Sequence, residues 1–102
     1  MTSEDADAWS EARAYRDEYE RLHTATEHVG RASAELIRAS GLVGDHVTAV
    51  GLRDALESLQ LLQAQLATAA EKAFSMGQMA ARRARHATLQ QQANEAMREE
   101  ES

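Results

Sequence analysis

The sequence predicts an all-α fold: an antiparallel two-helix hairpin of long, coiled-coil-like helices that dimerises into a four-helix bundle. Three observations lead to this prediction. The 102 residues include no proline and are rich in Ala, Glu, Arg, Gln and Leu, which are strong helix formers. Apolar residues recur at helical spacing in two long stretches. A glycine-containing segment, GLVGDHVTAVG at 41–51, separates these stretches. The length allows one domain at most, so we expect a single helical-hairpin domain over 1–102.

The first helix is expected over about residues 4–40. Ser3 and the acidic residues that follow it suit a helix N-terminus, where the helix dipole favours negative charge. Apolar or small residues then follow one another at alternating steps of three and four, as in a helix packed lengthwise on a partner. The members of this row are Ala8, Ala12, Tyr15, Tyr19, Leu22, Thr26, Val29, Ser33, Leu36, Ser40 and Val43.

A turn is expected over about residues 41–45. Gly41 follows the last residue of the first helix, where a left-handed conformation is commonly needed. Gly44 offers a second flexible position, and Asp45 is a suitable N-cap for the next helix. A phosphate-binding loop normally follows a β-strand, and the sequence predicts none here. We therefore interpret these glycines as turn residues.

The second helix is expected over about residues 46–95, followed by a frayed polar tail over about 96–102. Its main apolar row is Leu52, Ala55, Leu59, Leu62, Leu66, Ala69, Ala73, Met76, Ala80 and Ala87, with a flanking row of Leu56, Ala70, Gly77 and Ala84. This apolar surface is wider than one partner helix can cover, so we expect a homodimer or, failing that, a helical protein partner. The expected interface residues are Leu52, Leu56, Leu59, Leu62, Leu66, Met76 and Met79.

A short turn makes the two helices antiparallel neighbours. With the fold point near residue 43, the large side chains of Trp9, Tyr15 and Tyr19 would face the alanine-rich stretch 69–80, which contains Gly77. Large residues would then meet small ones, as close packing requires. The same register would bring the basic residues Lys72, Arg82, Arg83 and Arg85 beside the acidic residues Glu4, Asp5, Asp7 and Glu11.

Composition narrows the environment and the partners. No stretch approaches the roughly 20 apolar residues of a membrane span, and the acidic N-terminus is unlike a secretory signal. We therefore expect a soluble cytoplasmic protein that makes no membrane contact, although secretion by a route independent of a signal peptide stays open. The absence of cysteine excludes disulfides and cysteine-based zinc sites. A net charge of −6 argues against general binding of polyanions.

Glu20, His23 and Glu27 are the candidate metal ligands, because Glu20 and His23 form the Glu-x-x-His spacing of di-iron helical bundles. Such a site needs two of these motifs and further inward-facing carboxylates. Glu20 and His23 flank the apolar row instead of lying in it, and the second helix offers no inward carboxylate nearby. We interpret the three residues as an exposed ion-pair cluster and expect no metal and no cofactor.

Arg82, Arg83 and Arg85 form the candidate nucleic-acid contact, in the segment RRARH at 82–86. The acidic start of the first helix is a competing partner within the chain, and no aromatic residue lies nearby for base stacking. Linear spacing gives no Ser–His–Asp or paired-carboxylate arrangement, so we expect neither an enzyme nor a small-molecule substrate.

A chain of about this length, rich in alanine and with two helices around a glycine-containing turn, resembles the WXG100-type secreted proteins. The resemblance covers length and topology. Those proteins carry Trp-x-Gly in the turn, whereas here the turn reads GLVG and the tryptophan is Trp9. They often carry a Tyr-x-x-x-Asp/Glu signal after the second helix, whereas Tyr19 is the last tyrosine here. The resemblance implies a small secreted hairpin that acts as a heterodimer.

The function expected from the residues is a non-enzymatic protein–protein interaction module, such as an adaptor, a small regulator or an assembly component, that acts as a self-associating hairpin. One alternative is the WXG100-like heterodimer. A second alternative is a nucleic-acid-associated protein that uses Arg82–Arg85.

Overall fold

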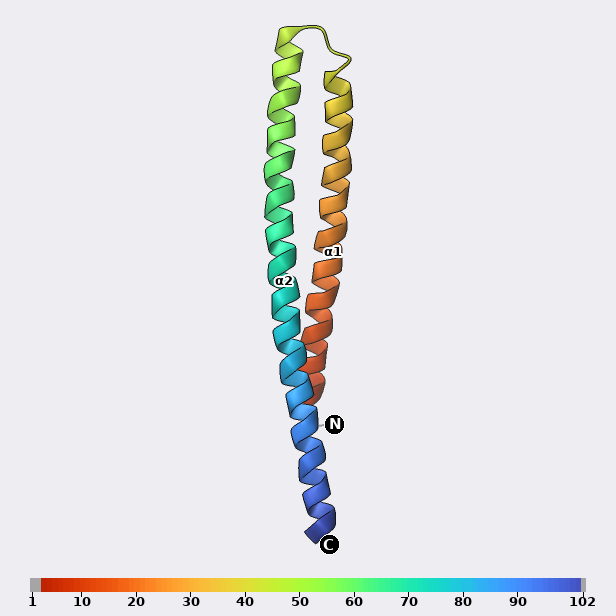
Figure 1. Cartoon of the computed structure of the whole chain (residues 1–102), viewed down its shortest axis with the longest axis vertical. Helices are drawn as coiled ribbons and strands as arrows, with labels where there is room; N and C mark the ends of the chain where they lie inside the picture. Colours follow the sequence, from red (N-terminus) through yellow and green to blue (C-terminus); the bar gives the residue numbers. More distant parts are fainter. Residues whose placement is uncertain (1–2, 102) are drawn as a thin grey trace. The chain divides into compact units, whose positions relative to one another are not determined.

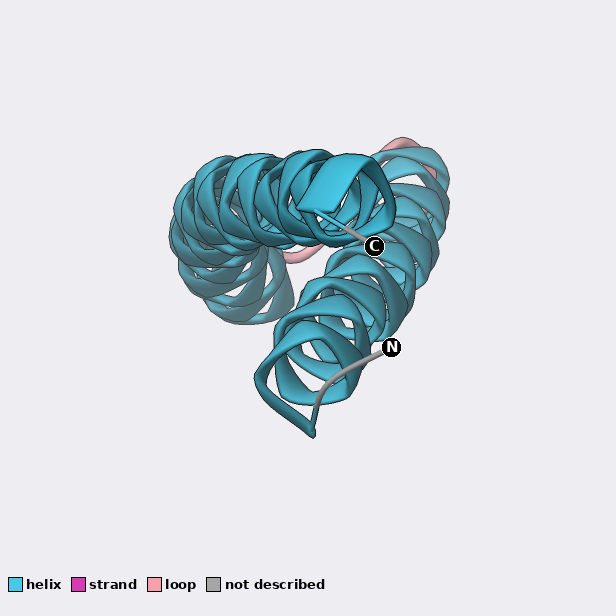
Figure 2. Cartoon of the chain, turned by 90° about the horizontal axis from the view of Figure 1, so that it is seen from below, coloured by secondary structure: helices cyan, strands magenta, loops and turns pink. Residues whose placement is uncertain are grey.

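Two helices, α1 (Ser3–Ser40) and α2 (His46–Glu101), form an all-α helical hairpin in the computed structural model (Figure 1). The structure describes residues 3–101, and side chains from residue 6 onward. Within 3–101 the non-helical segment is 41–45, drawn as the pink loop in Figure 2. The predicted fold class is therefore confirmed, and dimerisation stays a prediction. The N-terminal acidic residues Glu4 and Asp5, expected to meet the arginines, lie outside the described side chains.

The C-terminal tail is helical to Glu101, which corrects the expected end of α2 near residue 95. The tail sequence NEAMREEE consists mostly of residues with high helix propensity, which favours continuation of the helix to Glu101. Gln91 Nε2 also donates a hydrogen bond of 3.5 Å to Glu95 Oε1 one turn later. Polarity alone was therefore a poor indicator of where the helix ends.

The end of α1 contradicts the prediction of a left-handed Gly41, because no residue in the described part of the chain has a positive φ. The last turn instead tightens through bonds that span three residues. Gly41 N donates to Arg38 O at 3.2 Å, and Leu42 N donates to Ala39 O at 3.0 Å. These bonds satisfy the carbonyls at the helix end in right-handed geometry, so a left-handed residue is not required.

Contacts divide the chain into two compact units, each with a segment of both helices. Unit 1 consists of Met1–Glu18 and Lys72–Ser102, and unit 2 consists of Tyr19–Glu71, which includes the turn. The single domain predicted over 1–102 stays a prediction.

In unit 2 the two helices meet along a seam of half-buried residues, with Ser33 and Ala70 buried. On both helices the members alternate at steps of three and four residues. On α1 they are Leu22, Thr26, Val29, Ser33, Leu36 and Ser40, as predicted; on α2 they are Leu52, Leu56, Leu59, Gln63, Leu66 and Ala70.

Thr26, Ser33 and Ser40 recur every seven residues and occupy every second position of the α1 seam in unit 2, and each hydroxyl donates to the carbonyl four residues earlier. The bonds are Thr26 to Leu22 O at 2.8 Å, Ser33 to Val29 O at 3.1 Å and Ser40 to Leu36 O at 2.8 Å. A hydroxyl that is satisfied by its own helix can enter the seam without leaving an unpaired polar group. The small hydroxyl residues of the α1 seam can therefore pack against α2 without leaving a polar group that lacks a hydrogen bond.

In unit 1 the seam consists largely of small residues of α2. Ala73, Ala80 and Ala84 are buried, and Gly77 lies between them on the same face. A Cβ atom placed on Gly77 would lie 3.2 Å from Tyr15 Cβ, so the glycine allows the backbones to approach closely. The predicted meeting of a large α1 residue with the alanine-rich stretch is thus confirmed at Tyr15.

The register between the helices differs from the prediction. A hairpin folded symmetrically at residue 43 would place Gly30 opposite residue 57, but a Cβ on Gly30 would instead meet Gln63 Nε2 at 3.1 Å. The difference of six residues corresponds to about 9 Å along a helix. Figure 1 shows the reason: the turn continues past the end of α1 before α2 begins, so the first residues of α2 extend beyond Ser40.

Candidate interaction surface

The seven residues predicted as an interface fall into two groups. Five are half-buried and take part in packing within the chain: Leu52, Leu56, Leu59, Leu66 and Met76. The other two are largely exposed, Leu62 at 43% and Met79 at 50%. The hairpin therefore uses most of the predicted interface for its own folding.

Gln63, not Leu62, occupies the seam of α2 in unit 2, which sequence reasoning missed. Gln63 lies against Gly30 of α1, where the missing Cβ provides space for its amide group. The seam of α2 continues the steps of three and four residues that α1 shows, through Leu56, Leu59, Gln63 and Leu66. This regular spacing is the feature of the sequence that could have identified Gln63 as a seam residue. Leu62 is the more apolar of the two residues, so apolar character alone favours Leu62 over Gln63.

Exposed apolar side chains are numerous in unit 2. The large ones are Ile37, Leu42, Val47, Val50, Leu61 and Leu62. Leu42 is 89% exposed and Val47 is 82% exposed, because both lie at the turn end of the hairpin, where α2 extends past α1. In the described part of unit 1, the exposed large apolar side chains are Phe74, Met79, Leu89 and Met97. Exposed apolar side chains of this size are candidate contacts for a protein partner where they adjoin one another.

Asp45 caps the N-terminus of α2, as expected. Thr48 N donates a hydrogen bond of 2.8 Å to Asp45 Oδ2. This backbone bond holds the pKa of Asp45 below its usual value. Because the Asp45 carboxylate already accepts the Thr48 amide and places negative charge at this helix start, the position is unfavourable for binding a phosphate. A Cβ atom added to Gly44 would meet no other atom within 4 Å, so the turn has space for a side chain at this position.

The candidate metal ligands form an exposed cluster on α1. His23 Nε2 lies 3.2 Å from Glu27 Oε1, with both side chains more than half exposed, and the ring of His23 stacks on Tyr19 at 5.8 Å. Glu20 is exposed on the same helix. Among the residues described, no three His, Cys, Asp or Glu side chains come together in a way that could hold a metal ion. The geometry is that of an i, i+4 surface pair.

One arginine of the basic cluster has a partner within unit 1. Arg83 Nη2 donates a hydrogen bond of 3.0 Å to Glu11 Oε1, which confirms the predicted pairing of this arginine with the acidic start of α1. Arg82 and Arg85 are exposed on neighbouring faces of α2. The three arginines therefore do not present one common face to a phosphate backbone, since one of them is held by a carboxylate.

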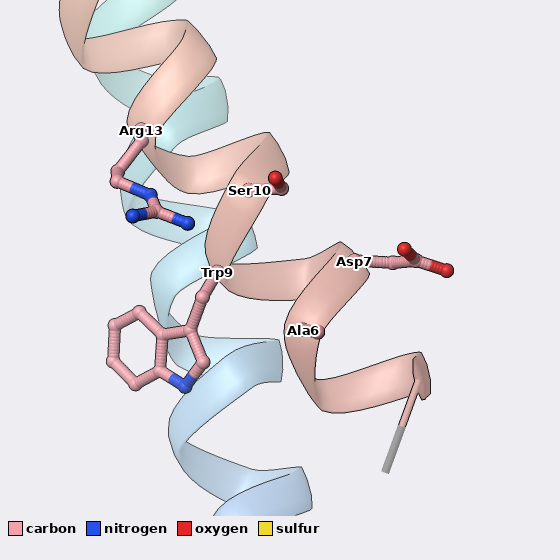
Figure 3. Close-up of a pocket in the computed structure, with 5 residues that line it drawn as sticks. All are labelled: Ala6, Asp7, Trp9, Ser10 and Arg13. Carbon is pink, nitrogen blue, oxygen red and sulfur yellow. The ribbon is translucent and has the colours of Figure 1, made fainter. Parts of the chain in front are cut away.

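A shallow hollow lies beside the first turns of α1, lined by Ala6, Asp7, Trp9, Ser10 and Arg13 (Figure 3). Trp9 and Arg13 project from one side of the helix, whereas Asp7 points away from them. Trp9 is the half-buried member and the others are exposed. Its indole Nε1 donates to Thr88 Oγ1 at 3.4 Å, and Thr88 in turn donates to Ala84 O at 2.9 Å. Trp9 thus serves packing within unit 1, and the lining offers no convergent polar groups for a ligand.

In the part of the chain that the structure describes, neither helix has a stretch apolar enough to cross a membrane. Comparison of the chain with protein-family models, with curated proteins and with solved structures gave no match.

Proposed function

We propose that this chain is a non-enzymatic protein–protein interaction module, an adaptor, small regulator or assembly component, that acts as a self-associating helical hairpin. The observation that carries this proposal is the composition of the core. Among the described residues, those that are buried are Ser33, Ala70, Ala73, Ala80 and Ala84, and no large side chain is fully buried. The leucines and aromatic residues all keep part of their surface in water.

Such a core provides limited stability to an isolated chain. Burial of apolar surface stabilises a fold by about 25 cal/mol per Å², so half-buried leucines contribute only part of what they could. Leu61 and Leu62 remain 62% and 43% exposed on unit 2. A partner that covers such side chains would gain the remaining hydrophobic free energy, which is the usual driving force of protein association.

The nucleic-acid alternative has less support from the contacts. A nucleic-acid role would need Arg83 free, whereas Arg83 is paired with Glu11 at 3.0 Å, and the net charge of the chain is −6. The WXG100-like heterodimer can be distinguished from self-association by one measurement. If the chain acts as a heterodimer, the purified chain alone should not form a symmetric dimer.

Sedimentation equilibrium tests the proposal on the full chain at tens of micromolar. We expect twice the 11.2 kDa chain mass, and a melting temperature that rises with protein concentration because association stabilises the folded state. A well-folded monomer with a concentration-independent melting temperature would show that self-association is wrong. Adding duplex DNA serves as the control for the nucleic-acid alternative, and we expect it to leave the measured mass unchanged.

A further inference from the structure

In unit 1, α2 carries a second row of residues at alternating steps of three and four, on the side that faces away from α1. The seam with α1 includes Ala80 and Ala84, which are buried, and the second row lies about half a turn of the helix from them. All members of the second row are exposed, so the packing of unit 1 leaves this surface accessible. They are Arg82, His86, Leu89, Ala93, Ala96 and Glu100, here termed the outer row.

The middle of the outer row is apolar, and its ends carry opposite charges. Leu89 is 64% exposed, and Met97, which adjoins the row, is 60% exposed. Ala93 and Ala96 lie between them on the same side of the helix. The row begins with an arginine and ends with a glutamate. An apolar centre with charged ends is the usual composition of a protein interface.

α2 also continues past the described start of α1. Trp9 Nε1 donates to Thr88 Oγ1 at 3.4 Å, and from this contact six described residues of α1 remain, whereas thirteen of α2 remain. Figure 1 shows the blue end of α2 beyond the first turn of α1. Every residue over 92–101 is exposed. A second helix can therefore lie along this part of α2 without displacing α1.

We propose that the outer row pairs antiparallel with the outer row of a second copy of this chain. The pairing rests on the proposed self-association and identifies the surface that it uses. With the two rows centred on residue 91, Arg82 of each copy faces Glu100 of the other. In the same register, Leu89 of each copy faces Ala93 of the other. These contacts are reciprocal, as a symmetric dimer requires.

The order of charges identifies a second copy as the occupant. A row that is basic at one end and acidic at the other matches itself when its direction is reversed. The antiparallel arrangement forms two Arg82–Glu100 pairs, and it brings Arg85, which adjoins the row, to the acidic segment 99–101 of the other copy. A parallel arrangement would place arginine against arginine and glutamate against glutamate, which opposes association. Charges beside a helix seam commonly set the orientation of the pair in this way.

Residue size favours the same register as charge. Leu89 of each copy lies over Ala93 of the other, so a large side chain meets a small one twice, as dense packing requires. Sliding one copy by seven residues keeps the rows in contact but places Glu100 against Leu89, or Arg82 against Ala93. Either shift loses the ion pairs. Charge and size therefore select one arrangement of the two copies.

Charge reversal tests the pairing in the full chain. Arg82→Glu and Glu100→Arg each replace two attractive contacts by two repulsive ones, so we expect each to raise the dimer dissociation constant at least about tenfold. The double variant Arg82→Glu/Glu100→Arg restores both pairs in reversed order and keeps the net charge of −6. We expect its dissociation constant to return to within threefold of the wild type. In a parallel pair the double variant would still place like charges together.

Arg98→Glu is the matched control for charge reversal. Arg98 is exposed on the same helix, but it lies on the side of α2 that continues the seam with α1. We expect this variant to change the dissociation constant less than threefold. Sedimentation equilibrium at low salt measures all four variants, and circular dichroism shows that each is helical. The effect of Arg82→Glu should shrink at high salt, because ions screen exposed charges.

Two leucines of nearly equal exposure test the apolar centre. Leu89 in the outer row is 64% exposed, and Leu61 in unit 2 is 62% exposed. We expect Leu89→Lys to raise the dissociation constant at least about tenfold, as for a central interface residue, and Leu61→Lys to change it less than threefold. The reverse result would place self-association on unit 2 and would overturn the pairing of the outer rows.

The outcomes separate the outer row from self-association itself. A wild-type chain that sediments as a folded monomer would refute both. A wild-type dimer that Arg82→Glu and Glu100→Arg leave intact would refute the outer row, while self-association still held. Weakening by both single variants without recovery in the double variant would contradict the antiparallel direction. Weakening by each single variant with recovery in the double variant supports the proposed pairing.

Discussion

Gly77 and Tyr15 mark a point in unit 1 where the two helices come close together. A Cβ atom on Gly77 would lie 3.2 Å from the Cβ of Tyr15, and 4.0 Å from the carbonyl oxygen of Ala12. Few real Cβ contacts are that short, and the atom facing Gly77 is fixed to the backbone of α1, so it cannot rotate away. The glycine is therefore a packing residue inside a helix.

This contact predicts different effects for two glycine substitutions within α2. A Cβ atom added to Gly51 would meet no atom within 4 Å, so Gly51→Ala should stabilise the chain by about 1 kcal/mol through helix propensity alone. Gly77→Ala should melt at or below the wild-type temperature, because the helices must separate to admit the methyl group. Thermal unfolding followed by circular dichroism compares the two variants. Equal stabilisation by both would show that the helices are not in close contact at Gly77.

The turn predicts a tolerant position at Gly41. Its φ is not positive, and an added Cβ would make an ordinary contact of 3.5 Å with Arg38 O. We expect Gly41→Ala to leave stability unchanged or to raise it by up to about 1 kcal/mol, since alanine reduces the entropy of the unfolded chain. The midpoint of urea unfolding measures this. A loss of 1 kcal/mol or more would instead indicate a left-handed Gly41.

Asp45 predicts a pH dependence at the start of α2. Its pKa is lowered from 3.8 by the backbone hydrogen bond from Thr48, so the folded state favours the charged carboxylate. The stabilisation is therefore present above pH 3.8 and is lost as the pH falls through the lower pKa of the folded state. We expect Asp45→Ala to melt below the wild type at pH 7 and the difference to shrink under strongly acidic conditions.

Asp45→Asn is the matched control for this effect, because asparagine caps a helix without titrating. Neither asparagine nor alanine titrates, so the difference in melting temperature between Asp45→Asn and Asp45→Ala should not depend on the protonation of residue 45. A wild-type advantage over Asp45→Ala that persists unchanged at pH 2 would argue against the charged cap.

From the geometry of His23 and Glu27 we expect metal ions to leave the stability of the chain unchanged. It lies 3.2 Å from Glu27, both side chains are exposed, and no third ligand from the described residues joins them. We expect addition of Fe(II), Mn(II) or Zn(II) to leave the melting temperature unchanged, since a ligand that bound the folded state would raise it. An increase of several degrees that disappears in His23→Ala would establish a metal site on α1.

By itself, the sequence determined the two helices, the position of the turn and the face of α1 that packs on α2. These features depend on local properties: helix propensity, the absence of proline, and a row from Ala8 to Ser40 whose spacing leaves one face available for packing. Asp45 could be predicted as a cap for the same reason, because capping involves only the next few residues.

Only the tertiary structure decided the register and the packing face of α2. Apolar residues lie on several sides of α2, so its pattern permits either Leu62 or Gln63 in the seam. The choice depends on what α1 places opposite, and there Gly30 leaves space for the amide of Gln63. Leu62 consequently stays 43% exposed. The complementarity of two surfaces is a property of the pair, and neither helix alone contains it.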